Sequence, residues 1–193
     1  ACLLALSSCG PAAQTGRDAT PLDGGIDVFT DAAPPQACEK MDILFVIDDS
    51  YSMDEEQANL AQNFPQFAAV IDNYVTRSNA LLDYRIGVTA TSRTGIALNG
   101  VPWTAEGGHD GALLMTDGCN MPRRWLQRTD PNVVQAFSCV AQVGIDGLGW
   151  EMPLLMIDWA LDERVLDGTN TGFVRDDALL AIVILTDEDD CSR

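Results

Sequence analysis

Two short apolar runs constrain the fold of this chain more than any other feature of its sequence. Residues 43–47 and 178–185 are apolar throughout, without the polar alternation of a half-exposed strand. Continuous runs of this length are typical of strands in a parallel sheet that is covered on both faces. Residues 83–91 form a further strand pattern, and helical patterns separate the strands. The sequence therefore predicts an α/β fold: a Rossmann-like, mostly parallel sheet with helices on both faces.

The helical patterns lie between these strands. Apolar residues recur at helical spacing from 60 to 71, and Ser52 with Glu55 forms a capping-box pattern ahead of them. Pro65 lies within this pattern and is expected to kink or split the helix. A further helix is predicted over 151–163, before the last strand.

The composition changes along the chain and divides it into three parts. Residues 1–9 resemble the end of a secretory signal that closes in a bacterial lipobox, so Cys9 is the expected lipidation site. Residues 10–37 are rich in Pro, Gly, Ala, Asp and Thr and are predicted to be a disordered tether. The folded domain is expected over 38–193, with an irregular insertion at about 92–132. Because the chain stops soon after a buried strand, we expect the domain to be truncated at its C-terminus.

The charge of the chain excludes one class of partner. Its 193 residues include 29 acidic and 11 basic side chains, which give a net charge of −18. Nucleic-acid binding needs stripes of Lys and Arg, which this sequence lacks, so no nucleic-acid partner is expected. No run approaches the roughly 18 apolar residues of a membrane span. We expect a protein of the cell envelope, on the periplasmic face or the cell surface, that contacts the membrane through its lipid anchor alone.

Four cysteines lie beyond the lipobox, an even number that is typical of disulfides in an exported protein. They allow three pairings. Proximity in the sequence favours Cys119–Cys139, which leaves Cys38–Cys191, with Cys38 just before the first strand and Cys191 just after the last. None of the four has the Cys-x-x-Cys spacing of a zinc site, so disulfides are predicted and not a zinc centre.

The residues that follow the first and last strands carry the chemistry. Asp48, Ser50 and Ser52 lie between the first strand and a helix, where one carboxylate and two hydroxyls can point to the same place. Asp187 follows the last strand, and ligands bind beyond the carboxyl ends of parallel strands. Oxygen donors without Cys or His favour Mg²⁺, with Ca²⁺ or Mn²⁺ as alternatives. The sequence predicts a divalent-cation site formed by these four residues.

These residues resemble the metal-ion-dependent adhesion site of the von Willebrand factor type A (vWA) domain. In that family an Asp-x-Ser-x-Ser segment, a distant Thr and a distant Asp hold the cation. Asp48, Ser50 and Ser52 match the first element, and Asp187 matches the last. The resemblance covers about residues 40–193, apart from the insertion, and the whole chain is similar to bacterial lipoproteins of this superfamily.

The chain departs from the family at the Thr. The expected segment, residues 143–151, contains none. Glu151 or, as the weaker choice, Asp146 can supply an oxygen there instead. A Glu at this position is equally well explained by another role: its negative charge can interact with the positive end of the dipole of the helix that follows it. A carboxylate from Glu151 would also shift the preference toward Ca²⁺. A second Thr-Asp pair at Asp117 lies in the insertion, and Asp187 is preferred because a longer strand precedes it.

The resemblance implies a non-enzymatic module that binds an unknown protein partner through its cation. Neutral hydroxyl ligands leave the cation electrophilic, so the partner is expected to offer a carboxylate. One alternative is a structural surface lipoprotein that metal and disulfides stabilise, and another is a metal-dependent hydrolase. His109, the only His, has no recognisable nucleophile partner, so no enzyme is expected. The other nearby acids are interpreted as a solvated rim or as a second cation site: Asp49, Glu188, Asp189 and Asp190.

Overall fold

The structure is a computed structural model of the chain. It describes residues 2–3, 39–98, 101–104, 108–147 and 149–192. The expected lipidation site Cys9, the predicted tether and Cys38 lie outside these residues. Within the described part of the chain, no helix is long and apolar enough to cross a bilayer.

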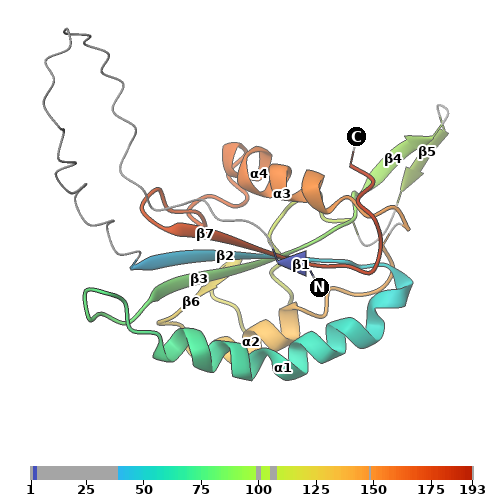
Figure 1. Ribbon diagram of the computed structural model, residues 1–193. Coiled ribbons are helices and arrows are strands. Elements are labelled where there is room, and N and C mark those ends of the chain that lie inside the picture. Colours follow the sequence, from blue (N-terminus) through green and yellow to red (C-terminus); the bar gives the residue numbers. More distant parts are fainter. Residues whose placement is uncertain (1, 4–38, 99–100, 105–107, 148, 193) are drawn as a thin grey trace, which may run out of the picture.

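A five-stranded mixed sheet forms the centre of the described structure, in the order β1-β7-β2-β3-β6 (Figure 1). Its three inner strands are parallel, and the two outermost strands, β1 and β6, are short and antiparallel to their neighbours. The predicted α/β class with a mostly parallel sheet is therefore confirmed. The strands span Cys2–Leu3 (β1), Lys40–Ile47 (β2), Asp83–Ala90 (β3), Trp125–Gln127 (β6) and Leu179–Leu185 (β7).

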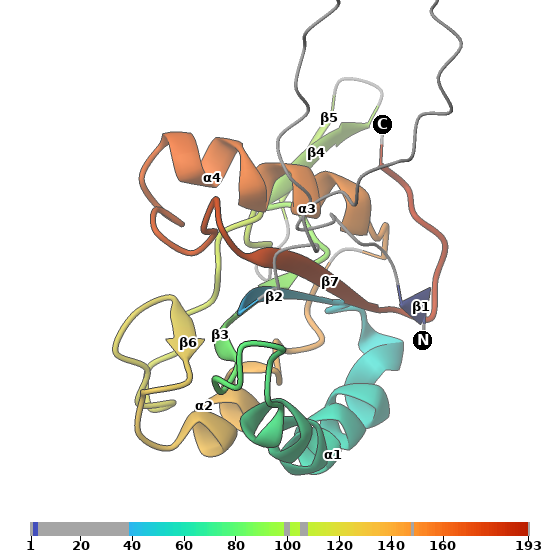
Figure 2. The ribbon, with the colours of Figure 1, turned by 60° about the vertical axis from the view of Figure 1, so that its left-hand side comes forward.

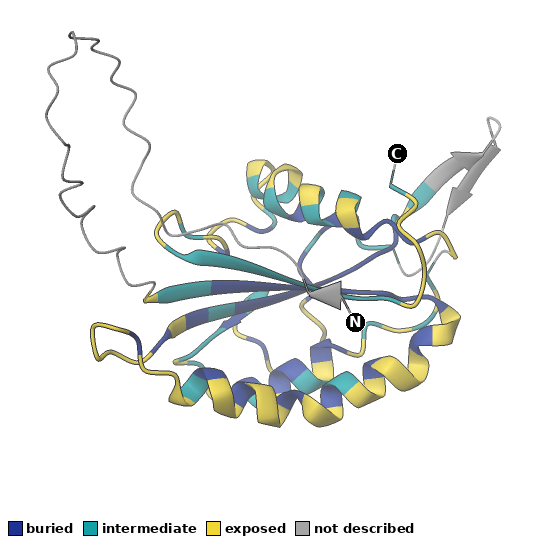
Figure 3. Ribbon diagram, in the orientation of Figure 1, coloured by how far each residue is buried: buried dark blue, intermediate teal, exposed yellow. Residues whose placement is uncertain are grey.

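The three parallel strands end at the same level. Ile47 of β2 pairs with Ala90 of β3 on one side and with Leu185 of β7 on the other. The last six residues of β2 are buried, whereas β7 is half-buried along its whole length (Figure 3). The residues that directly follow the three strands therefore lie next to one another at the carboxyl edge: Asp48, Thr91 and Thr186.

Helices cover both faces of the sheet (Figure 2). On one face lie α1 (Asp54–Asn73), which follows a 3₁₀ turn η1 (Tyr51–Met53), and α2 (Val133–Val140). On the other face lie α3 (Pro153–Leu161) and α4 (Glu163–Leu166).

Alternating side chains of β2 pack into these two layers. Ile43, Phe45 and Ile47 belong to the core on the α1 and α2 side. Leu44 and Val46 pack with residues of α3 on the opposite side. Burial on both faces explains why this strand has no polar alternation.

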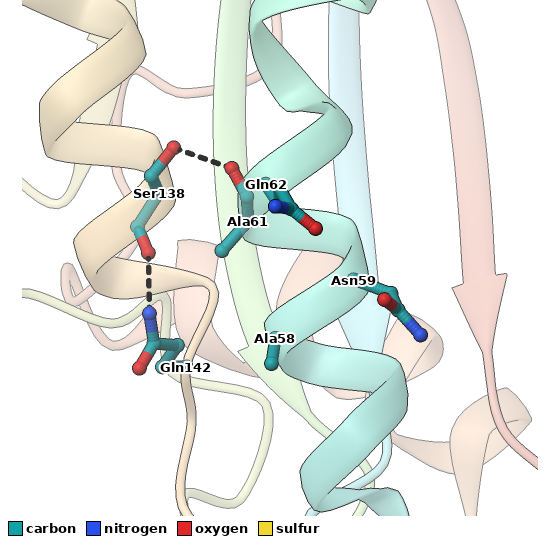
Figure 4. A pocket seen from close by; sticks show the side chains of 6 residues that line it. All are labelled: Ala58, Asn59, Ala61, Gln62, Ser138 and Gln142. Carbon is teal, nitrogen blue, oxygen red and sulfur yellow. Dashed lines mark hydrogen bonds between the residues drawn. The ribbon is translucent and has the colours of Figure 1, made fainter.

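Of the two effects expected of Pro65, the split is absent, because α1 continues through this residue. Proline has no N–H, so it cannot bond to the carbonyl of Ala61, one turn earlier. Ser138 of α2 donates its hydroxyl to that carbonyl instead, at 2.9 Å. Figure 4 shows this bond in a groove of about 470 Å³ between the two helices. The groove is lined by Ala58, Asn59, Ala61, Gln62, Ser138 and Gln142.

The predicted capping box at the start of α1 is also wrong. The helix has no side-chain cap, and Ser52 lies in the preceding 3₁₀ turn. Its first turn instead carries three acidic residues, which the positive end of the helix dipole stabilises. The Ser52 hydroxyl is turned toward the carboxyl edge of the sheet.

The insertion is more regular than its sequence indicates. It contains a two-stranded hairpin of β4 (Gly95–Leu98) and β5 (Val101–Thr104), followed by β6. The predicted Cys119–Cys139 disulfide is present and joins the insertion to α2.

The predicted Cys38–Cys191 bridge is not formed. Cys191 is a free, exposed cysteine, and its backbone N–H donates to the carbonyl of Glu151 at the carboxyl edge. Cys38, outside the described residues, precedes Lys40, where β2 begins at the opposite edge. A strand of this length separates the two edges by more than about 20 Å, whereas disulfide Cα atoms lie about 6 Å apart. The start of one strand and the end of its parallel neighbour therefore lie far apart, in agreement with a free Cys191.

We expect Phe137→Ala to destabilise the domain by about 3–5 kcal/mol, because it removes a buried ring from the core. The Phe137 ring is fully buried, stacks on Phe64 with 3.5 Å between centroids and meets Phe45 edge-on at 4.8 Å. Phe67→Ala is the control, since that ring is 37% exposed and should cost about 1 kcal/mol. Urea unfolding measures both variants, and equal losses would contradict the packing described here.

Candidate metal centre

The candidate site begins with Asp48, which is fully buried at the end of β2. Its backbone N–H donates to the carbonyl of Leu185 at 2.9 Å, which ties it to β7. Its Oδ1 accepts the backbone N–H of Ser50 at 2.8 Å, and its Oδ2 accepts the hydroxyl of Thr186. Three contacts from two segments therefore hold the carboxylate in one orientation.

The other predicted ligands lie beside Asp48 and form what we term the outer group: Ser50, Ser52 and Asp187. The two serine Oγ atoms are 3.2 Å apart, and Ser52 Oγ donates to Asp187 Oδ1 at 3.3 Å. Neighbouring oxygens around one cation lie about 3.0 Å apart for Mg²⁺ and about 3.4 Å apart for Ca²⁺ in octahedral geometry. The spacing of the outer group falls within this range, and Ser52 and Asp187 are open to solvent.

A second cluster, the inner group, lies on the buried side of Asp48. Oxygen atoms of Asp48, Asp49 and Glu151 all lie within 4.8 Å of one another, and Asp187 does not belong to this set. Asp49 is 1% exposed and Glu151 is 0% exposed. Thr91, at the end of β3, donates its hydroxyl to Glu151 Oε2 and lies 3.3 Å from Asp49 Oδ1.

Two oxygen atoms of the inner group are left without a partner. Asp49 Oδ2 and Glu151 Oε1 are buried and make no hydrogen bond within the described part of the chain. None of the ion pairs among the described residues involves these carboxylates. A buried ionised carboxylate without a positive partner costs several kcal/mol, so this arrangement calls for a proton or a cation.

Burial changes the acidity of both side chains. It raises the pKa of Asp49 from 3.8 to about 6, against hydrogen bonds from Ser92 and Thr91 that lower it. It raises the pKa of Glu151 from 4.5 to about 8; the hydrogen bond from Thr91 opposes this, and the negative charges of Asp48 and Asp49 add to it. Glu151 therefore resists ionisation at neutral pH unless a positive charge joins the inner group.

The glycine-rich loop that lacks the family Thr packs its backbone against Asp49. Gly147 N–H donates to the Asp49 carbonyl at 2.9 Å, and a Cβ at Gly147 would lie only 2.4 Å from Asp49 Cγ. Gln57 of α1 donates one amide group to the carbonyls of Asp48 and Gly144, both at 2.8 Å. A backbone without a side chain is therefore required at this point of the loop.

The structure shows which of the remaining predicted residues lie in the cluster and which do not. Glu151 lies in the inner group, two residues before α3, and it touches Thr91 rather than the outer serines. Asp146 is exposed and lies outside the cluster. The interpretation of Asp49 as part of a solvated rim is wrong, because the Gly147 loop covers it. Asp190 accepts the backbone N–H of Leu154 at 3.0 Å and so caps the first turn of α3.

Three further residues belong to the site although the sequence reasoning did not select them. Thr91 and Thr186 each follow a buried strand directly, so the rule that selects Asp48 would have selected them as well. Gln57 lies in the apolar stripe of α1 at helical spacing from Ala61 and Phe64, where a polar residue is unusual.

Comparisons with protein-family models, with curated proteins and with solved structures gave no match. The interpretation of the carboxyl edge of the sheet therefore depends on the residues that lie there. Its donors are carboxylate and hydroxyl oxygens, and two of them are buried without a partner. Such a donor set fits Mg²⁺, Ca²⁺ or Mn²⁺.

In a chelating buffer, we expect the free energy of unfolding to fall as the pH rises from about 4.5 to about 8. Across this window the folded protein keeps a proton on Glu151 that the unfolded chain has released, so alkali favours unfolding. Glu151→Gln should flatten the profile by an amount on the order of a few kcal/mol. Glu163→Gln, at an exposed position, should leave it unchanged. Parallel stability profiles for wild type and Glu151→Gln would disprove the raised pKa of Glu151.

Gly147→Ala should displace Asp49 and weaken divalent-cation binding, since the new Cβ would overlap the Asp49 carboxylate. Gly149→Ala is the matched control in the same loop, because a Cβ there meets nothing within 4 Å. We expect a loss of about tenfold or more in cation affinity for the first variant and none for the second. Isothermal titration with Ca²⁺ measures the affinity of both variants. Equal affinities would refute the close approach of Gly147 to Asp49.

Proposed function

We propose that this domain is a non-enzymatic module that binds a protein partner through a divalent cation, as vWA domains with an adhesion site do. The observation that carries the proposal is the outer group, where oxygens of Ser50, Ser52 and Asp187 converge beside Asp48. The parallel strand order and the position of this group beyond β2 and β7 support a vWA-type fold.

The exposure of the outer group supports binding rather than burial of the cation. Ser52 and Asp187 are exposed, and Tyr51, between the two serines, is 82% exposed. Mg²⁺ takes octahedral oxygen coordination and keeps waters that another ligand can displace. Two carboxylates and two neutral hydroxyls leave coordination positions open, and a carboxylate of the partner is the ligand we propose for one of them.

The place of action is part of the same proposal. The lipobox pattern at Cys9 and the tether after it support display on the cell envelope, with the domain held away from the membrane. The Cys119–Cys139 disulfide is compatible with an oxidising compartment.

A second candidate is a purely structural cation. The buried, unpartnered oxygens of Asp49 and Glu151 favour it, because a cation there would hold two loops together without any partner. Both roles can coexist, since Asp49 and Glu151 are buried whereas Ser52 and Asp187 are exposed.

The test compares cation and partner binding in matched variants. Ser52→Ala and Asp187→Asn should lower Mg²⁺ affinity by about tenfold or more, because the first removes a hydroxyl ligand and the second removes the negative charge of a ligand. The folded state without cation should keep its melting temperature, since both side chains are exposed. Asp117→Asn is the control: this exposed Asp stands in a Thr-Asp-Gly turn away from the edge.

Partner capture then separates adhesion from a structural role. Envelope proteins retained by the immobilised wild-type chain in Mg²⁺ should be released by a chelator. They should not be retained by Ser52→Ala, whereas Asp117→Asn should retain them. Retention that survives chelator or Ser52→Ala would refute cation-mediated adhesion, and so would the absence of saturable Mg²⁺ binding.

A further inference from the structure

The inner group holds more negative charge than one cation in the outer group can balance. A divalent ion beside Ser50 and Ser52 would be neutralised by Asp48 and Asp187 together. Asp49 and Glu151 would remain, both buried and each with one oxygen atom that accepts no hydrogen bond within the described part of the chain. These two carboxyl groups can be ionised together only if a further positive charge joins them.

The geometry of the inner group matches a cation of its own. The three carboxylate oxygens lie within 4.8 Å of one another, which equals about twice a Ca²⁺–oxygen distance of 2.4 Å, the limit for two ligands on opposite sides of one ion. Asp187 is not within this set, so the outer and inner groups are not one ligand sphere. Thr91 adds a neutral hydroxyl that already contacts both Asp49 and Glu151.

We propose that a second divalent cation, with Ca²⁺ preferred, binds between Asp48, Asp49 and Glu151 on the buried side of the outer group. Asp48 lies between the two positions and is shared by them. Three carboxylates favour Ca²⁺ over Mg²⁺, because Ca²⁺ takes more oxygen ligands in a more flexible arrangement. Two divalent ions then balance the four carboxylates of the edge: Asp48, Asp49, Glu151 and Asp187.

The inner cation would join two loops that are far apart in the sequence. Asp49 belongs to the loop after β2, and Glu151 follows the glycine-rich loop before α3. One backbone hydrogen bond already joins these loops, from Gly147 to Asp49, and another ties the segment after β7 to Glu151 through Cys191. A cation at this point would hold the floor of the outer site in place, a role that goes beyond partner binding.

Cation stoichiometry on the full chain tests the proposal, with Ca²⁺ alone as the probe. Isothermal titration of chelator-treated protein should give two Ca²⁺ ions per wild-type chain. Asp49→Asn and Glu151→Gln should each leave one, with affinity at the inner site reduced by about tenfold or more, since ligand charge sets affinity in oxygen sites. Ser52→Ala should also leave one, at the inner site. Asp146→Asn, in the same loop but exposed, should keep both.

The outcomes separate this inference from the proposed function. One Ca²⁺ per wild-type chain, lost in Ser52→Ala and unaffected by Glu151→Gln, would overturn the inner site and leave the outer one intact. One Ca²⁺ weakened by all three variants would mean a single shared site and would also overturn the inference. One Ca²⁺ that only Asp49→Asn and Glu151→Gln remove would overturn the outer site instead. The wild-type stoichiometry shows whether two sites exist, and the variants show which site is missing when only one Ca²⁺ binds.

Discussion

The parallel pairing of β2 with β3 on one side and with β7 on the other determines where every polar group of the candidate site lies. Because Ile47 pairs with both Ala90 and Leu185, the three strands end at one level. The next residue of each strand then leaves the sheet at the same edge. A slip of one residue in either pairing would turn these side chains to the opposite face and would separate the carboxylate from its hydroxyl partners.

The carboxyl edge combines a buried half with an open half, and this asymmetry shapes its chemistry. On the buried side, Asp49 and Glu151 lose their hydration without gaining a Lys or Arg partner among the described residues. On the open side, Ser52 and Asp187 keep contact with solvent. The proposed inner cation would neutralise the first half, and the proposed outer cation would remain accessible in the second. The stability of the edge and its proposed capacity to bind would therefore depend on neighbouring oxygens.

Much of this arrangement was predictable from local sequence. The apolar runs identified β2 and β7, and the predicted ligands Asp48 and Asp187 follow these two strands at the same edge of the sheet. Pro65 was misleading because its effect depends on whether another donor replaces the missing N–H, and Ser138 of a distant helix does so. The Cys38–Cys191 pairing was wrong, since Cys191 is free. In a parallel sheet the start of one strand and the end of its neighbour lie at opposite edges.

The sequence by itself determined the α/β class, the strands that are buried on both faces and the Asp-x-Ser-x-Ser element, since each depends on patterns within a few residues. Only the tertiary structure decided that Asp49 is buried, that Thr91 contacts Glu151 and that Gly147 closes over them. These residues come from three separate loops, and no local pattern encodes their distances. Burial and the charge balance that follows from it exist only once the loops have packed together.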